Sequence, residues 1–215
     1  MHPSRLRAAP EILPTTVLIA CSLAGPAAVA IAGSDPAPAS AAAAEPPTAL
    51  VIVDIQDFYF PGGGMALVEP EGAAARAGRL LARFRHRGDL VIHVRHEAAA
   101  KAEIHPAVAP QPGETVITKR HVNSFRETDL LERLRAEQVE RLVICGMQTH
   151  MCVEAAARAA ADLGFQVMVV GDACATRDLT HGGRTVAAAD VHAATLASLQ
   201  RTYAEIVTTD EFLAR

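Results

Sequence analysis

The stretch Ala49-Leu50-Val51-Ile52-Val53-Asp54 joins five apolar residues to a single carboxylate. An unbroken run of this length, rich in Val and Ile, is typical of a strand buried on both faces of a parallel sheet. Similar apolar runs follow at residues 90–94, 115–118, 142–145, 167–170 and 206–208. Amphipathic stretches that predict helices separate most of them, at residues 73–87, 129–137, 152–163 and 186–203. This alternation predicts an α/β fold, a three-layer α/β/α sandwich around a mostly parallel six-stranded sheet.

The composition is that of an ordinary folded domain without a basic surface. The 215 residues include 20 Lys and Arg against 24 Asp and Glu, for a net charge of −4, and 50% are apolar while 4% are aromatic. The apolar content excludes a disordered chain, and the scarcity of aromatic residues disfavours an all-β sandwich. The acidic balance gives no electrostatic reason to expect nucleic acid as a partner. Four Cys at this length do not form a disulfide framework, so we expect free thiols.

Residues 1–33 resemble an export signal. Arg5 and Arg7 precede an uncharged run from residue 12 to residue 34, which is the layout of a basic head before an apolar export core. Two processing patterns are present: a small-residue cleavage pattern at residues 30–32, and a lipoprotein-like box at residues 18–21 whose Cys21 would be acylated. We therefore expect export from a bacterial cell, with membrane association only through this segment. The alternatives are an apolar tail on a cytoplasmic protein and an uncleaved anchor.

Residues 34–47 are rich in Ala, Pro and Ser, a composition that cannot bury enough apolar surface to order itself. We interpret this segment as a linker. The folded domain is therefore expected over residues 48–215.

Candidate site residues follow from the predicted sheet, because ligands of open parallel sheets bind beyond the carboxyl ends of the strands. The residues that follow the apolar runs are Asp54, His96 with Glu97, Lys119, the segment 146–152 and Asp172.

Cys152 is placed where a loop enters a predicted helix. The unpaired amides at a helix N-terminus stabilise a thiolate, so this position predicts a lowered thiol pKa and a nucleophile at neutral pH. A buried inert thiol is the alternative reading of Cys152. For Cys145, at the end of an apolar run, and for Cys174, in a following loop, a structural role is the simpler interpretation.

Lys119 and Asp54 end two other apolar runs. Lys119 is one of only two Lys in the chain, with Lys101, and a Lys can be tuned by burial where an Arg stays protonated. Taken alone, Lys119 also fits a solvated strand end, and Asp54 fits a turn or cap. Because Asp54, Lys119 and Cys152 follow three strands of one sheet, we expect them to converge on one crevice.

Three ordered motifs carry a resemblance to a known family. They are residues 49–56 (ALVIVDIQ), Lys119 with residues 123–125 (NSF), and residues 146–153 (GMQTHMCV) followed by Ala157 and Arg158. On these motifs the chain resembles the isochorismatase-like cysteine hydrolase superfamily, which includes nicotinamidases and N-carbamoyl-amide hydrolases. The likeness extends from about residue 48 to residue 213.

The resemblance implies an Asp-Lys-Cys catalytic triad that hydrolyses a small amide or related C–N bond through a thioester. Asp54 would be the general base, Cys152 the nucleophile, and Lys119 the cation that holds the other two in place. The family also places a non-proline cis peptide before the nucleophile, here between Met147 and Gln148. The backbone N–H groups of Gln148 and Cys152 are then the expected oxyanion hole.

Departures from relatives limit how far the resemblance extends to the substrate. Nicotinamidases carry an Asp-x-His metal motif, whereas His93 and His96 here are three residues apart on a strand and would point to opposite faces. No metal and no other cofactor is therefore expected. Phe58, His96 and His150 are candidates for the substrate pocket. The glycines at 62–64 do not form a dinucleotide fingerprint and are interpreted as a turn near the pocket mouth.

Two other functions stay open at this stage. Isochorismatases cleave a vinyl ether by acid chemistry and can lack the Cys, and a non-catalytic binding protein could keep the same fold. Family members commonly form dimers or tetramers, so we also expect a homo-oligomer whose partner in catalysis is a small molecule.

Overall fold

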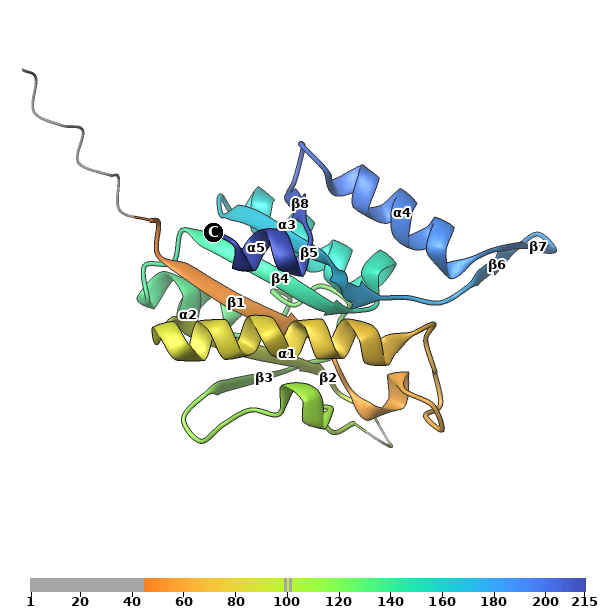
Figure 1. The fold of residues 1–215 in the computed structure, drawn as a ribbon, viewed down its shortest axis with the longest axis horizontal. Coiled ribbons are helices and arrows are strands. Elements are labelled where there is room, and N and C mark those ends of the chain that lie inside the picture. Colours follow the sequence, from red (N-terminus) through yellow and green to blue (C-terminus); the bar gives the residue numbers. More distant parts are fainter. Residues whose placement is uncertain (1–44, 99, 101) are drawn as a thin grey trace, which may run out of the picture. The chain divides into compact units, whose positions relative to one another are not determined.

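A central parallel sheet organises the part of the chain that the computed structural model describes, which is residues 45–98, 100 and 102–215. Six strands form it in the order β3-β2-β1-β4-β5-β8, and every neighbouring pair is parallel (Figure 1). The strands are β1 (Thr48–Val53), β2 (Leu90–His96), β3 (Thr115–Lys119), β4 (Arg141–Met147), β5 (Gln166–Ala175) and β8 (Glu205–Val207). The predicted α/β class and six-stranded parallel sheet are confirmed.

Helices cover both faces of the sheet, which makes three layers (Figure 1). The helix α1 (Pro70–Arg87) and the short α5 (Thr209–Leu213) lie on one face. The opposite face carries α2 (Leu130–Ala136), α3 (Glu154–Asp162) and α4 (Ala188–Leu199). Short helical turns lie at Asp57–Tyr59, Pro106–Val108 and Thr149–Val153. None of the helices within the described ranges is long and apolar enough to cross a membrane. The predicted export segment and most of the linker lie outside those ranges.

The fourth predicted helix, over 186–203, is wrong at both ends. Val186 belongs instead to an antiparallel hairpin of β6 (Leu179–His181) and β7 (Arg184–Val186), turned by Gly182 and Gly183 at φ 57° and 75°. The side chain of Asp178 accepts a hydrogen bond from the Ala188 N–H, so the helix starts there. The helix ends at Leu199, because the N–H groups of Tyr203 and Ala204 both donate to the Leu199 carbonyl and the chain turns there.

The other predicted boundaries differ by a few residues. The first helix starts at Pro70 rather than at residue 73, since proline is favoured in the first turn of a helix. The last strand is displaced by one residue from its predicted range.

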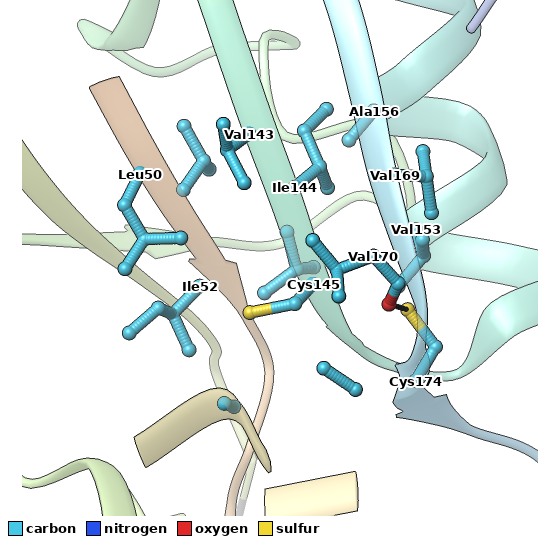
Figure 2. Close-up of a cluster of buried hydrophobic side chains, with 14 of the residues drawn as sticks. Leu50, Ile52, Val143, Ile144, Cys145, Val153, Ala156, Val169, Val170 and Cys174 are labelled. Atoms are coloured by element: carbon cyan, nitrogen blue, oxygen red, sulfur yellow. Dashed lines mark hydrogen bonds between the residues drawn. The ribbon is translucent and has the colours of Figure 1, made fainter. Parts of the chain in front are cut away.

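The core is made by strand residues and the helix faces that pack on them. Leu50, Ile52, Val143, Ile144 and Val169 are at most 2% exposed, and Figure 2 shows them beside Val153 and Ala156 from the turn and helix that follow β4.

Two of the cysteines belong to this core. Cys145 is fully buried, and Cys174 is buried with its thiol donating to the Val170 carbonyl at 3.4 Å (Figure 2). Burial raises the pKa of Cys145, and it raises the pKa of Cys174 to about 12. The structural role predicted for both thiols is therefore confirmed, and the three cysteines of the described chain are free.

Gly146 pairs with Val53 at the end of the β1–β4 register. Its φ is 132°, and a Cβ at this position would lie 1.9 Å from the Val53 carbonyl oxygen. Only glycine lets the two strands pair here. The next residue on the β1 side is Asp54, with φ 51°, so the chain leaves β1 through a left-handed residue at the carboxyl edge of the sheet.

Candidate active site

Four side chains meet at the carboxyl edge of the sheet. Asp54 follows β1, His96 ends β2, Lys119 ends β3, and Cys152 lies in the turn after β4. The register pairs His96 directly with Lys119 across β2 and β3. The positions predicted for Asp54, Lys119 and Cys152 do converge, although they lie up to 98 residues apart in sequence (152 − 54).

The ammonium of Lys119 is the centre of the cluster. Its Nζ lies 2.7 Å from Asp54 Oδ2 and donates to Cys152 Sγ at 3.2 Å and to His96 Nδ1 at 3.1 Å. The side chains of Lys119 and Asp54 are fully buried, and Cys152 is 5% exposed. A buried charge is tolerated only when paired, so the ion pair explains how a Lys can be placed inside this protein.

Burial is the main influence on the pKa values of Asp54 and Cys152. Burial raises the pKa of Asp54, and the neighbouring Lys119 charge acts in the opposite direction. Burial and the negative charge of Asp54 raise the pKa of the Cys152 thiol to about 12, against the smaller effect of Lys119. The predicted lowering of the Cys152 pKa is therefore wrong. The resting Cys152 is therefore a thiol.

The loop before Cys152 explains the error. Thr149–Val153 form a π-helical turn, and α3 starts only at Glu154, so Cys152 is not at the first turn of a regular helix. The Met147–Gln148 peptide bond is cis. Thr149 is buried, and its Oγ1 lies 2.9 Å from Nδ1 of His192 on α4, which ties the turn to the helical layer.

Gln56, which is fully buried, fixes the backbone of His96 through hydrogen bonds. The Gln56 amide accepts from the His96 N–H at 2.7 Å and donates to the His96 carbonyl at 3.0 Å and the Ala102 carbonyl at 2.7 Å. Burial and the nearby Lys119 charge lower the pKa of His96. A neutral imidazole with an unprotonated Nδ1 is the form that accepts a hydrogen bond from Lys119.

The same cluster is the only one in the described ranges whose donor atoms could hold a metal. One ligand atom each from Asp54, His96 and Cys152 lie within 4.8 Å of one another. All three, however, contact the Lys119 ammonium, which takes the position a metal ion would need. His93 has a different partner, since its Nε2 lies 2.9 Å from Glu114 Oε2. These residues therefore do not fit a metal site while Lys119 is in place.

A cavity of about 480 Å³ opens onto Cys152. Its walls are mainly apolar and come from loops, with Phe58, Met65, Val122 and Met151 among the lining residues. Phe58 and His96 line it as expected. His150 does not, because its ring turns to Thr176, whose Oγ1 is 2.6 Å from His150 Nδ1.

Sequence reasoning missed Arg177, which also lines the cavity. It missed Gln56 as well, although Gln56 ends the first quoted motif. The glycine turn is at the cavity, as interpreted, since Gly64 is in its wall.

Comparison with known proteins identifies the family of the chain. Residues 48–211 match the family model described as the isochorismatase domain. The chain belongs to the isochorismatase family. Among family members, the Bacillus subtilis protein named uncharacterized isochorismatase family protein YddQ is 45% identical over 177 residues, which is 77% of this chain and 98% of that protein. The crystal structure of a cysteine hydrolase from Pseudomonas syringae is 26% identical with a TM-score of 0.75, covering 78% of this chain and 91% of that one.

Two further relatives have names that state an activity. Streptothricin hydrolase of Streptomyces noursei is 38% identical over 140 residues, which is 61% of this chain and 50% of that protein. Maleamate amidohydrolase of Pseudomonas putida is 29% identical over 186 residues, which is 75% of this chain and 83% of that protein.

Proposed function

We propose that this isochorismatase-family hydrolase cleaves the C–N bond of a small amide through a thioester on Cys152. The observation that carries the proposal is the buried Lys119 ammonium, which contacts both the Asp54 carboxylate and the sulfur of Cys152, a residue that lines the cavity. The amidohydrolase and hydrolase names of two relatives support the same chemistry. Asp54, Lys119 and Cys152 are the proposed catalytic residues.

The first half of the reaction makes the acyl-enzyme. The Cys152 sulfur attacks the amide carbonyl carbon while its proton passes to Asp54, whose carboxylate oxygen lies within 4.8 Å of the sulfur. The raised pKa values of both groups favour a transfer that is concerted with attack, because neither a free thiolate nor a second buried charge has to form. Asp54 then gives this proton to the leaving nitrogen, the C–N bond breaks, and the amine departs neutral.

The second half releases the acid. A water molecule gives a proton to Asp54 and attacks the thioester carbonyl, and the C–S bond breaks as the sulfur recovers the proton. The Lys119 ammonium lies beside both the Asp54 carboxylate and the Cys152 sulfur, so it stabilises the Asp54 carboxylate before the attack and again after the proton has passed to the leaving nitrogen. The backbone N–H groups of Gln148 and Cys152 are the proposed donors to the carbonyl oxygen as it becomes an oxyanion.

The test is capture of the intermediate. The protein is incubated with a panel of small amides, release of ammonia or amine is measured, and acid-quenched samples are examined by mass spectrometry for an acyl group on Cys152. We expect release and an adduct in the wild type, and neither in Cys152→Ala. Turnover that survives Cys152→Ala would reject the thioester route. Cys145 and Cys174 serve as internal controls, because Cys152 lines the cavity and these two do not, so they should stay unmodified.

We propose in addition that the chain is exported through residues 1–33 and acts as a homo-oligomer. N-terminal sequencing of protein made in a bacterial host should start near residue 33 or show an acylated Cys21. Light scattering should give a mass at least twice 22.6 kDa for the full chain.

A further inference from the structure

The turn that carries Cys152 has an unusual backbone. Thr149–Val153 form a π-helical turn, and α3 starts only after it. The N–H groups of Met151 and Val153 both donate to the Gln148 carbonyl, at 3.1 and 3.3 Å. Such turns are rare and wider than the α-helix that follows. Contacts with neighbouring segments therefore help to decide where the Cys152 sulfur lies.

The first of these contacts joins the start of the turn to α4. Thr149 is fully buried, and its Oγ1 lies 2.9 Å from His192 Nδ1. Burial lowers the pKa of His192, so its ring is neutral near pH 7, and a neutral imidazole can form this hydrogen bond in either tautomer. A buried hydroxyl that loses its partner is costly to the fold. The Thr149 hydroxyl is therefore held against His192.

The helix that carries His192 is itself fixed in place. Thr195 and Leu199 on the same helix are buried. Arg158 of α3 also donates to the Ser198 hydroxyl at 3.0 Å, so α4 is joined to the helix that continues from the turn. His192 thus extends from a fixed base toward Thr149.

A second contact holds the next residue of the turn from another direction. His150 Nδ1 lies 2.6 Å from Thr176 Oγ1, just after β5, and the Thr176 carbonyl accepts from the Val68 N–H at 2.9 Å. Two consecutive residues of the turn are therefore each joined by a hydrogen bond to a different segment.

Both outer partners lie away from the substrate cavity. His192 and Thr176 line a different cavity, of about 240 Å³. Neither is among the described residues that line the cavity at Cys152. Substitution of His192 therefore leaves the wall that faces the substrate unchanged, and an effect on the reaction would have to pass through the turn.

We propose that His192 is a positioning residue for the reaction, because through Thr149 it holds the turn in the arrangement that keeps the Cys152 sulfur beside the Lys119 ammonium. This inference rests on the proposed thioester chemistry and adds to it a residue outside the substrate cavity. A displacement of a reacting group by about 1 Å can slow a reaction by about 100-fold. The loss of this contact should therefore appear in kcat rather than in KM.

The kinetic test uses the amide of the panel that the wild type hydrolyses fastest. His192→Leu removes the ring nitrogens, and Thr149→Val removes the hydroxyl but keeps its shape. Each should lower kcat by about 10- to 100-fold with little change in KM. His192→Asn, which keeps a polar group near the position of Nδ1, and Thr149→Ser, which keeps the hydroxyl, should each recover part of the loss. The double variant His192→Leu with Thr149→Val should lose no more than the worse single variant, because both changes remove one contact.

The matched control is Thr195→Val, one turn further along the same helix. The Thr195 hydroxyl donates to the Val191 carbonyl within α4 at 2.7 Å, so this variant disturbs the helix without touching the turn. We expect Thr195→Val to unfold at a lower urea concentration and to keep the wild-type kcat. Equal losses of kcat in Thr195→Val and His192→Leu, or additive losses in the double variant, would overturn the inference.

A measurement without substrate separates this inference from the proposed chemistry. Hydrogen exchange followed by mass spectrometry reports the protection of the backbone in the segment 147–153. We expect folded His192→Leu to lose protection there, whereas Thr195→Val keeps it and β1 stays protected in both. Unchanged protection of this segment in His192→Leu would overturn the inference, whether or not any amide is cleaved. Loss of protection in a protein that cleaves no amide and forms no adduct on Cys152 would reject the proposed function and still confirm that His192 holds the turn.

Discussion

Replacing Lys119 with Met tests whether one buried cation sustains the chemistry of the site. At the observed separations of 2.7 Å to Asp54 Oδ2 and 3.2 Å to Cys152 Sγ, Coulomb attraction with an effective dielectric constant near 20 is about 6 kcal/mol for a charge on the oxygen and about 5 kcal/mol for one on the sulfur. The two values are close, so Lys119 stabilises a negative charge on Asp54 and one on Cys152 to nearly the same extent. Its main effect is therefore to stabilise the presence of a negative charge in this buried site.

Removal of the ammonium should therefore add a proton to the site. Burial already raises the pKa of Asp54, and without Lys119 that pKa rises further. Asp54 in Lys119→Met is then protonated at pH 7, where it cannot act as a base, and a thiolate at Cys152 loses about 5 kcal/mol of stabilisation. Because each 1.36 kcal/mol corresponds to a factor of ten, we expect alkylation of Cys152 at pH 7 to slow by roughly 10³- to 10⁴-fold.

The assay is the second-order rate of iodoacetamide labelling of Cys152, followed by peptide mass spectrometry from pH 6 to pH 10. In Lys119→Met the rate should recover as the pH rises, because hydroxide then removes the added proton. Arg120→Met is the matched control, since it removes an adjacent but exposed positive charge. Loss of one partner from a buried pair costs about 3 to 5 kcal/mol of stability, so Asp54→Asn with Lys119→Met, which removes both charges, serves as a folding reference. A folded Lys119→Met protein that labels within tenfold of the wild type, with the same pH dependence, would refute the reasoning.

Three further variants probe other parts of the structure. His96→Leu removes the acceptor of Lys119 Nζ, and we expect kcat to fall by about 10- to 100-fold with a smaller change in KM. His96→Asn keeps an acceptor and should recover part of the lost activity. Equal losses of kcat in the two variants would count against a positioning role for His96. Gly146→Ala brings a Cβ to 1.9 Å from the Val53 carbonyl, and urea unfolding should show a loss of at least about 2 kcal/mol, whereas Gly113→Ala, also at positive φ but in open space, should cost less. Arg85 lowers the pKa of Glu114 to about 2, below its ordinary 4.5. The ionised Glu114 therefore contributes its full stabilisation above about pH 4.5, and this stabilisation is lost as the pH falls toward 2. Thermal melts of Glu114→Gln should differ most from the wild type near pH 7 and converge with it in acid.

The sheet and the three catalytic candidates could be predicted because they depend on features that sequence displays directly. Buried parallel strands are continuous apolar runs, and the first polar residue after such a run has to lie at the ligand-binding edge. Asp54 and Lys119 were found in this way, and Cys152 from the loop that follows the fourth run. The hairpin carries a signal as well, the Gly182-Gly183 pair, but the sequence analysis assigns no strand there and begins the last helix at Val186, which lies in the hairpin.

The remainder depends on distances that sequence does not contain. The contact between His96 and Lys119 follows from the register of β2 and β3, and Arg177 reaches the cavity from a loop without any periodic pattern. The pKa of Cys152 was predicted in the wrong direction for a related reason. Position in the chain suggested a helix terminus, whereas the direction of the pKa change is set by the extent of burial and by the nearness of the Asp54 charge.

The catalytic candidates and most of the cavity wall come from different segments of the chain, which has a practical consequence for redesign. Asp54 and Lys119 lie at strand ends and Cys152 lies in the turn after β4, while Phe58, Met65 and Val122 belong to connections outside the strands of the sheet. Mutant libraries confined to these connections should yield enzymes with new selectivity and unimpaired reactivity. The same separation would let related enzymes evolve to act on new nutrients or toxins through substitutions in their surface segments alone.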